Sequence, residues 1–250
     1  HPGPAPGGRN DTEPLNDMSL VDFGLLQPGH SDHDAVERMM RGLRRHRAAH
    51  PDKPVMVGEA AWEGMHGGAG PKTQRNLFWA AILSGCLGHC YGTDSLWQMN
   101  HASEPFGPSP HGHVWGTAPW QAAMHWEGST HVGRAAAFLR DTTALPLTPE
   151  PDAVAPAWSP ENGAGAFAAR DGEGRRYFYF PRIVAPWAKG YTARNLGAAS
   201  RWTAKWWDPL SGEIVDLGDI TSDADGSWKI PSAPVLHDWV LLLERAPALP

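Results

Sequence analysis

The chain has 250 residues, of which 41% are hydrophobic and 10% aromatic, and this is enough apolar material for one large or two ordinary globular domains. The net charge of -6 arises from 21 basic and 27 acidic residues without a basic stripe, so neither a nucleic-acid partner nor an anionic membrane is indicated. No apolar run approaches the roughly 20 residues that would span a bilayer.

The first part of the chain alternates between predicted strands and helices. In chain order we expect a strand over 20–26, a helix over 33–49, a strand over 55–57, a helix over 73–84, a strand over 87–91, and a helix with Val132, Ala135, Ala136 and Leu139 on one face. Ser31 and Asp34 resemble a capping box for the first helix, and residues 64–70 form a glycine-rich loop. Apolar strands that alternate with helices predict a parallel α/β sheet.

The pattern changes after about residue 150. Two hairpins are predicted, one from 166–169 with 176–180 and one from 202–207 with 213–217, followed by strands over 228–230 and 239–243. Gly212 is available for a left-handed position in the second hairpin. Short strands without helices predict a β-sandwich. A proline-rich stretch over 145–156 marks the junction, so we expect two domains, 1–148 and 149–250.

Several polar and aromatic side chains follow the predicted parallel strands, where ligands bind in such folds because loops can vary there. They are Gln27, His30, Glu59, Trp62, His89, Tyr91 and Trp97. In the stretch KPVMVGEAAWEGM, Glu59 ends a buried strand beside small residues, a position suited to a nucleophile or base. The alternative is a carboxylate that caps a helix or pairs with an arginine. We expect Glu63, in the glycine-rich loop, to be solvated.

The stretch GHCYGTDSLWQMN, residues 88–100, mixes hydrogen-bonding groups with aromatic rings, which suits a sugar with hydroxyl edges and apolar faces. Its candidate binding residues are His89, Tyr91, Asp94, Trp97 and Gln98, with Asn100 nearby. The structural alternative is that the tryptophan fills a core and that the polar residues form turns.

Other kinds of chemistry find no motif in the sequence. Cys86 and Cys90 are four residues apart, a spacing that fits neither a CxxC redox site nor a four-ligand zinc site, so free thiols are expected. Four histidines match no recognised metal spacing, namely His30, His33, His111 and His113. HExxH, GxSxG, P-loop and dinucleotide motifs are absent. Neither a metal nor another cofactor is predicted.

A resemblance to a known family rests on four segments in order: KPVMVGEAAWEG, FWAAILSGCLGHCYGTDSLWQMN, WEGSTHVGRAAAFLRD, and a β region with KWWDPLSGEI and HDWVLLLE. Together they are similar to the C-terminal part of the apiosidase-like glycoside hydrolases. In that family a (β/α)8 TIM barrel precedes a β-sandwich labelled "putative collagen-binding domain of a collagenase". The implied fold is the C-terminal part of such a barrel, over 1–148, followed by the sandwich, over 149–250. No mechanism for gripping collagen is visible in the second region.

The resemblance implies a retaining hydrolase with two carboxyl groups, in which Glu59 is the nucleophile. The family carries the acid/base on an earlier barrel strand, for which this chain shows no counterpart, and three strand–helix units cannot close an eight-stranded barrel. We therefore expect the chain, which begins at His1, to need an upstream half of the barrel, attached or in trans. The family often has Asn where Asp94 stands and His where Thr93 stands, so the contacts of this loop can differ.

Three functions stay open from the sequence. The first is a retaining glycoside hydrolase acting on a polysaccharide side chain, with apiose-containing side chains among the candidates, and His30, Trp62, His89, Tyr91, Asp94, Trp97 and Gln98 as the substrate-binding residues. The second is a non-catalytic carbohydrate- or matrix-binding protein, and the third is a piece that is inactive by itself. An oligo- or polysaccharide is the expected partner. The family resemblance favours a secreted or periplasmic location.

Overall fold

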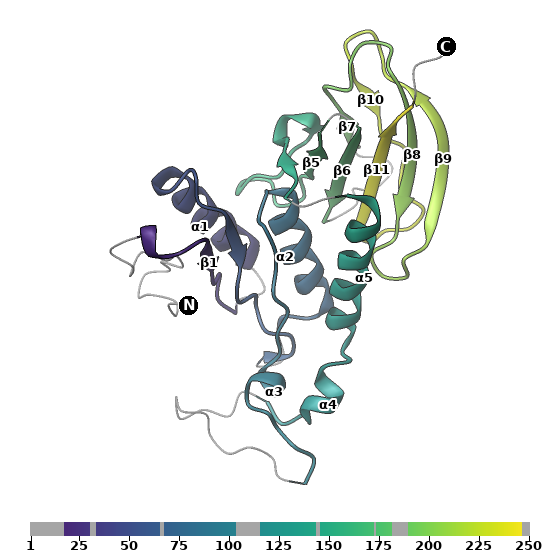
Figure 1. The fold of residues 1–250 in the computed structure, drawn as a ribbon. Helices are drawn as coiled ribbons and strands as arrows, with labels where there is room; N and C mark the ends of the chain where they lie inside the picture. The colour runs from purple at the N-terminus through teal and green to yellow at the C-terminus, as the bar shows by residue number, and fades with distance from the viewer. Residues whose placement is uncertain are drawn as a thin grey trace. The chain divides into compact units, whose positions relative to one another are not determined.

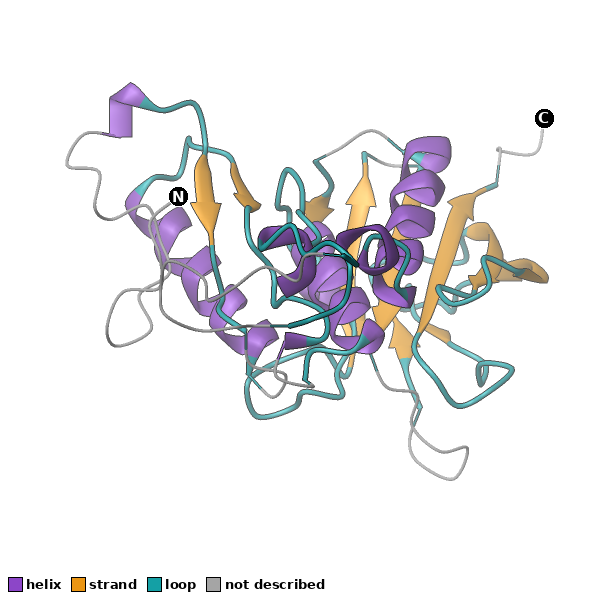
Figure 2. Cartoon of the chain, turned by 90° about the horizontal axis from the view of Figure 1, so that it is seen from below, coloured by secondary structure: helices purple, strands orange, loops and turns teal. Residues whose placement is uncertain are grey.

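The structure is a computed structural model, and it describes residues 18–30, 34–65, 68–103, 116–143, 146–172, 174–181 and 190–246. The chain divides into two compact units: a first unit of 1–81 with 86–137, and a second unit of 82–85 with 138–250. Helices provide most of the regular structure of the first unit and strands that of the second (Figures 1 and 2). No helix in the described part of the chain is long and apolar enough to cross a membrane.

The first unit is built from short parallel strands and helices. Its elements are a 3₁₀ helix (Met18–Leu20), β1 (Gly24–Leu26), α1 (Ala35–Ala49), β2 (Val55–Val57), α2 (Pro71–Leu83), α3 (Asp94–Trp97), α4 (Trp120–Ala123) and α5 (Glu127–Thr142), of which α2 and α5 end in segments assigned to the second unit. Strands β1 and β2 pair in parallel, with Leu26 opposite Val57, and Val57 forms a further parallel bridge to His89. The expected parallel α/β arrangement is thus present locally.

Burial explains why the helices form where the apolar periodicity places them. In α1, Met39 and Leu43 are buried on one face. In α2, Gln74, Arg75 and every residue from Leu77 to Leu83 are buried. In α5, Val132, Ala135 and Leu139 are buried as predicted, whereas Ala136 is exposed because it lies beyond the edge of this face.

Some boundaries differ from the predictions. The first strand begins at Gly24 rather than residue 20, because only Gly24–Leu26 reaches β2, and Leu20 is exposed. The predicted strand over 87–91 is assigned only as a bridge at His89, but its backbone follows β2: Leu87 and Cys90 donate to the carbonyls of Val55 and Val57, and Val57 donates to that of Gly88. Asp34 is the N-cap of α1, but its side chain makes no capping bond and pairs with Arg38 instead. Ser31, the other half of the predicted capping box, lies outside the described residues.

The second unit contains two antiparallel sheets. The six-stranded sheet has the order β3-β5-β6-β11-β8-β9 and the three-stranded sheet the order β10-β7-β4. Their bounds are β3 Thr148–Pro149, β4 Val154–Ala155, β5 Phe167–Asp171, β6 Arg175–Phe180, β7 Thr192–Ala193, β8 Arg201–Trp207, β9 Ile214–Thr221, β10 Trp228–Lys229 and β11 Trp239–Arg245. Both predicted hairpins are present, as β5–β6 and β8–β9. Gly212 has the left-handed conformation expected of it, with φ of 81°.

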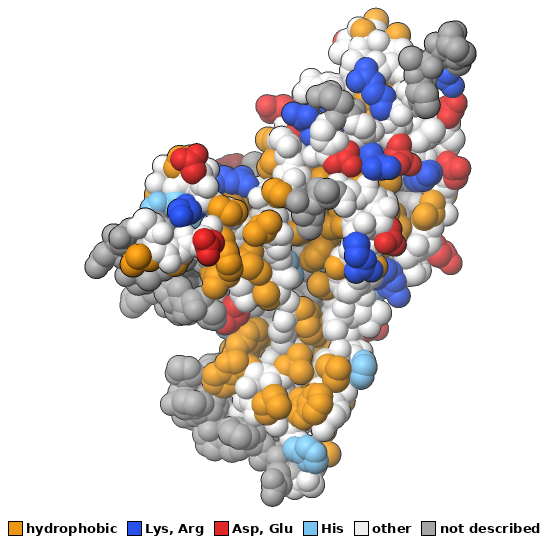
Figure 3. All heavy atoms as spheres, in the orientation of Figure 1, with side chains coloured by type: hydrophobic (Ala, Val, Ile, Leu, Met, Phe, Trp, Pro, Cys, Tyr) orange, Lys and Arg blue, Asp and Glu red, His pale blue; other side chains and the backbone are white. Residues whose placement is uncertain are grey.

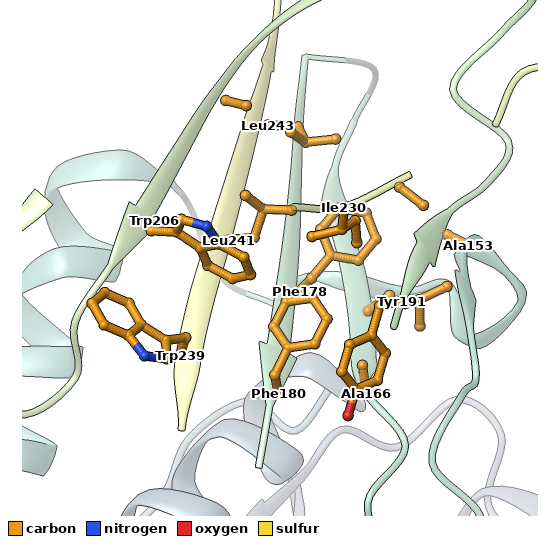
Figure 4. Packing of buried hydrophobic residues seen from close by; sticks show 14 of the residues in the cluster. Ala153, Ala166, Phe178, Phe180, Tyr191, Trp206, Ile230, Trp239, Leu241 and Leu243 are labelled. Carbon is orange, nitrogen blue, oxygen red and sulfur yellow. The ribbon is translucent and has the colours of Figure 1, made fainter. Parts of the chain in front are cut away.

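One hydrophobic cluster joins the two sheets of the second unit. Phe178 and Phe180 from β6 and Leu241 from β11 lie beside Tyr191 and Ile230, which flank the short strands β7 and β10 (Figure 4). The side chains of Phe178, Phe180 and Leu241 are almost completely buried. Burial of a large apolar side chain contributes about 1.5–3 kcal/mol, so this cluster stabilises the unit strongly.

Charged side chains of both signs are intermixed on the face of the second unit that Figure 3 shows. Several form ion pairs across neighbouring strands. Glu244 of β11 accepts from Arg175 of β6 at 2.8 Å and from Lys205 of β8 at 3.1 Å. Such exposed pairs are worth about 0–1 kcal/mol each, so they add little to the core.

Candidate functional site

Glu59 lies just beyond the carboxyl end of β2, where its carboxylate is only 13% exposed. Its Oε1 atom accepts a hydrogen bond from Nε2 of Gln27 at 2.5 Å and lies 3.1 Å from Nε2 of His30. Gln27 and His30 follow β1. Because β1 and β2 are parallel neighbours, their carboxyl ends meet at the same edge, and this brings the three side chains together.

The hydrogen bond to Nδ1 of His30 determines which of the two ring nitrogens carries the proton. The backbone N–H of Trp62 donates to Nδ1 of His30 at 3.1 Å, so Nδ1 must hold a lone pair. The hydrogen therefore resides on Nε2, which donates it to Oε1 of Glu59. In this network His30 is a neutral imidazole that donates to the carboxylate, and Gln27 provides a second donor to the same oxygen.

Three aromatic rings extend from this carboxylate. The rings of His30 and Trp62 have their centroids 4.6 Å apart, and those of Trp62 and Trp97 5.4 Å apart. Trp62 is 8% exposed and Trp97 is 42% exposed, so the row of rings runs from the interior to the surface. Aromatic faces beside polar groups are typical of sugar-binding sites.

A second carboxylate, Glu63, is buried in the same unit. It is only 5% exposed, so the prediction that it is solvated was wrong. Its Oε2 accepts from the hydroxyl of Tyr91 at 2.6 Å, and its Oε1 accepts from the backbone N–H of Gly128 in the first turn of α5 at 3.1 Å. These donors, with the positive end of the helix dipole, compensate the loss of water around the charge.

The hydroxyl of Tyr91 therefore binds Glu63 in this structure. Burial raises the pKa of the Tyr91 hydroxyl well above its usual range, and the hydrogen bond to Glu63 acts in the same direction. The hydroxyl thus keeps its proton and stays a donor to the Glu63 carboxylate.

The other predicted binding residues have local roles. Asp94 is 2% exposed, and its Oδ1 accepts from the backbone N–H and the hydroxyl of Ser95 in the first turn of α3. Gln98 is buried at the end of that helix, and its backbone N–H donates to the carbonyl of Asp94. These contacts agree with the structural alternative of turn formation, and a role of either residue in binding stays a prediction.

His89 has a different environment. Its ring packs edge-on against Phe78 of α2, with the centroids 5.6 Å apart. Both ring nitrogens are buried, and neither has a hydrogen-bond partner among the described residues. Burial lowers the pKa of His89 to about 4.

The structure thus brings His30, Trp62 and Trp97 into one connected group with Glu59 and places Tyr91 on Glu63. Sequence reasoning placed Gln27 at the correct strand end but did not select it as a site residue. Its position at the end of the strand that pairs with the Glu59 strand is the signal that could have found it.

No group of three or more potential metal ligands occurs among the residues that the structure describes. His33, His111 and His113 lie outside those residues. Cys86 is buried and Cys90 exposed, and both are free thiols as predicted.

Comparison with known proteins places these observations in a family. A family model described as "Apiosidase-like, catalytic domain" matches residues 1–145. No curated protein matches the chain. A solved structure described as "Glycoside hydrolase" is 18% identical with a TM-score of 0.77, and covers 95% of this chain and 56% of its own. A glycoside hydrolase family 5 protein from Bacteroides vulgatus ATCC 8482 is also 18% identical, with a TM-score of 0.72, 95% coverage of this chain and 54% of its own.

At 18% identity these structures establish similarity of fold alone. The chain spans little more than half the length of both solved proteins.

Proposed function

The chain belongs to the apiosidase-like family, and from this membership we propose that the full-length protein is a retaining glycoside hydrolase with Glu59 as its nucleophile. The observation that carries the proposal is the position of Glu59, whose carboxylate is largely buried at a parallel strand end and faces two N–H donors. We further propose that residues 1–148 are the C-terminal part of a (β/α)8 barrel and 149–250 a β-sandwich. The acid/base would then lie in a part of the barrel outside this chain.

The proposed reaction has two displacements. The Glu59 carboxylate attacks the anomeric carbon and forms a glycosyl ester, while the bond to the leaving oxygen breaks and the acid/base, about 5–5.5 Å from the nucleophile, supplies its proton. Water, deprotonated by the same acid/base, then attacks the anomeric carbon, and Glu59 leaves as a carboxylate. Gln27 and His30 donate to that carboxylate, so they orient it for attack and stabilise it when it departs.

The proposed substrate is a side chain of an oligo- or polysaccharide, with apiose-containing chains as the first candidates from the family. The ring of Trp97, which is 42% exposed, would pack on the apolar face of a sugar, and the buried ring of Trp62 would support it from below. A secreted or periplasmic location is proposed because such polymers lie outside the cytoplasm.

The test compares full-length wild-type protein with Glu59→Gln. We expect wild type to release sugar from at least one member of a panel of plant and microbial polysaccharides, and the first product seen by NMR to keep the anomeric configuration. Glu59→Gln should lose at least about 1,000-fold in kcat and retain its melting temperature. Glu213→Gln, a change at an exposed glutamate in the second unit, is the matched control and should leave kcat unchanged.

Three results would contradict this proposal. Retained turnover in Glu59→Gln would exclude the nucleophile role, and an inverted product would exclude the double displacement. Glycan binding without any hydrolysis by the full-length wild type would favour a carbohydrate-binding protein instead.

A further inference from the structure

The segment that follows Glu59 is held by groups from several different elements. The carbonyl oxygen of Ala61 accepts from Nε2 of Gln74, a buried residue of α2, at 2.5 Å. The backbone N–H of Trp62 donates to His30, as described above. Two consecutive residues are thus fixed by side chains from α2 and from the end of β1.

Glu63 continues this anchoring with both its backbone and its side chain. Its backbone N–H donates to the carbonyl of Gly92 at 3.0 Å, and Glu63 forms a parallel bridge with Thr93. Its carboxylate binds Tyr91 and Gly128, one on the segment that leads to Trp97 and the other on α5. One buried carboxylate therefore links three segments that are distant in sequence.

The carboxylate of Glu63 is closely packed against Gly128, at the start of α5. A Cβ atom added at Gly128 would overlap Oε2 of Glu63 and would lie 2.7 Å from Cγ of Gln74. A Cβ added at Gly64, which has φ of 80°, would lie 2.5 Å from Cζ3 of Trp126. A side chain at Gly128 would therefore force the Glu63 carboxylate or Gln74 to move, and the left-handed backbone at Gly64 favours glycine there.

We infer that Glu63 is a positioning residue for the proposed reaction. Its carboxylate connects the segment that carries Glu59 and Trp62 to the segment that carries Trp97. In this proposal the hydroxyl of Tyr91 hydrogen-bonds to Glu63 and does not contact the sugar. The inference rests on the proposed function, because a positioning role needs a reaction. The consequence is kinetic, since a misplacement of about 1 Å in a reacting group can cost on the order of 100-fold in rate.

The test uses the full-length protein with two variants and two matched controls. Tyr91→Phe removes one donor and keeps the ring, and Gly128→Ala displaces the carboxylate by a methyl group. Tyr191→Phe removes a tyrosine hydroxyl that is bound elsewhere, to the carbonyl of Ala164. Gly133→Ala adds a methyl group to the same helix at a position where, apart from the adjacent helix backbone and chain neighbours, nothing lies within 4 Å.

Two measurements separate positioning from simple support. Hydrogen–deuterium exchange of a peptide covering 59–65 should become at least about tenfold faster in Tyr91→Phe and Gly128→Ala, and stay unchanged in both controls. With the polysaccharide that wild type hydrolyses, kcat should fall about tenfold or more in both variants, with KM changed less than about twofold. The kinetics are measured at least 15 °C below each melting temperature, so that only folded enzyme is compared.

The outcomes distinguish the two proposals. A lower melting temperature with unchanged kcat in Tyr91→Phe would show structural support only and would overturn the positioning role. Unchanged exchange over 59–65 would overturn it as well. Absence of turnover in the wild type would instead overturn the proposed function, and with it the reaction that Glu63 is inferred to serve. Gly128→Ala adds a bulky group and can fail to fold. In that case Tyr91→Phe alone decides whether Glu63 has a positioning role.

Discussion

Nε2 of His30 lies 3.1 Å from Oε1 of Glu59. This contact connects the loop after β1 to the loop after β2. His30 is the donor in this hydrogen bond, because its other ring nitrogen, Nδ1, accepts from the backbone N–H of Trp62. A residue that the sequence suggested as a sugar ligand thus acts, in this structure, on the candidate nucleophile itself.

Replacing His30 should therefore impair turnover more than binding. In full-length His30→Phe we expect kcat to fall about 10- to 100-fold, because a hydrogen bond to a charged group is worth about 1.5–3 kcal/mol. Steady-state kinetics on the wild-type substrate measure the effect. His125→Phe, a change at an exposed histidine of the same unit, should have wild-type kcat. Equal kcat values for the two variants would show that His30 has no role in turnover.

Replacing Gln27 should lower the activity without lowering the stability of the protein. Gln27 is 6% exposed and donates to Glu59, whereas its Oε1 is buried and has no partner among the described residues. Gln27→Met removes the donor and this unpaired acceptor together. We expect kcat to fall about tenfold, while the melting temperature stays within about 3 °C of wild type, since loss of an unpaired buried polar group offsets loss of the bond.

The control for Gln27→Met is Gln121→Met, at an exposed glutamine. Calorimetry and kinetics on the two variants decide the matter. A large loss of stability in Gln27→Met with full activity per folded molecule would mean that the amide supports the fold and not the reaction.

His89 should make the protein less stable in acid. Burial lowers its pKa from 6.5 to about 4, so the folded protein binds this proton less readily than the unfolded chain does. Stability from this residue is fully present above pH 6.5 and is lost as the pH falls from about 6.5 to 4. At 1.36 kcal/mol per pKa unit the loss is at most about 3 kcal/mol.

Urea unfolding of wild type and His89→Phe at several pH values between 4 and 7 tests this. The variant should lack most of the decrease in unfolding free energy below pH 6.5, whatever its absolute stability at pH 7. His101→Phe, at an exposed position, should retain the wild-type dependence. Parallel curves for wild type and His89→Phe would contradict the assignment.

The two cysteines should differ sharply in reactivity. Cys90 is exposed, whereas burial raises the pKa of the Cys86 thiol to about 12, with an opposing influence from Arg47. Because the thiolate is the reactive form, iodoacetamide at pH 8 should modify native protein once, at Cys90, and modify Cys86 only after unfolding. Intact mass and peptide mapping give the count and the position. Modification of Cys86 in folded protein would show that its segment opens readily.

Local patterns predicted the elements that depend on local chemistry. Apolar periodicity placed α1, α2 and α5, and turn residues placed the hairpins β5–β6 and β8–β9, because neighbouring residues decide these structures. The predicted strand over 87–91 pairs with β2 through backbone hydrogen bonds but is regular only at the bridge of His89. The two-residue strands β3, β4 and β7 were missed.

Within the candidate site, the sequence by itself determined that Glu59 ends an apolar strand beside small residues and that aromatic side chains follow nearby, since strand ends can be read from hydrophobic runs and their interruption. Only the tertiary structure decided which atoms meet. Gln27 and His30 reach Glu59 because two parallel strands end at one edge, and Glu63 is buried because Tyr91 and the start of α5 surround it. Hydrogen-bond partners 28 to 65 residues apart along the chain follow from packing, and no local pattern encodes them.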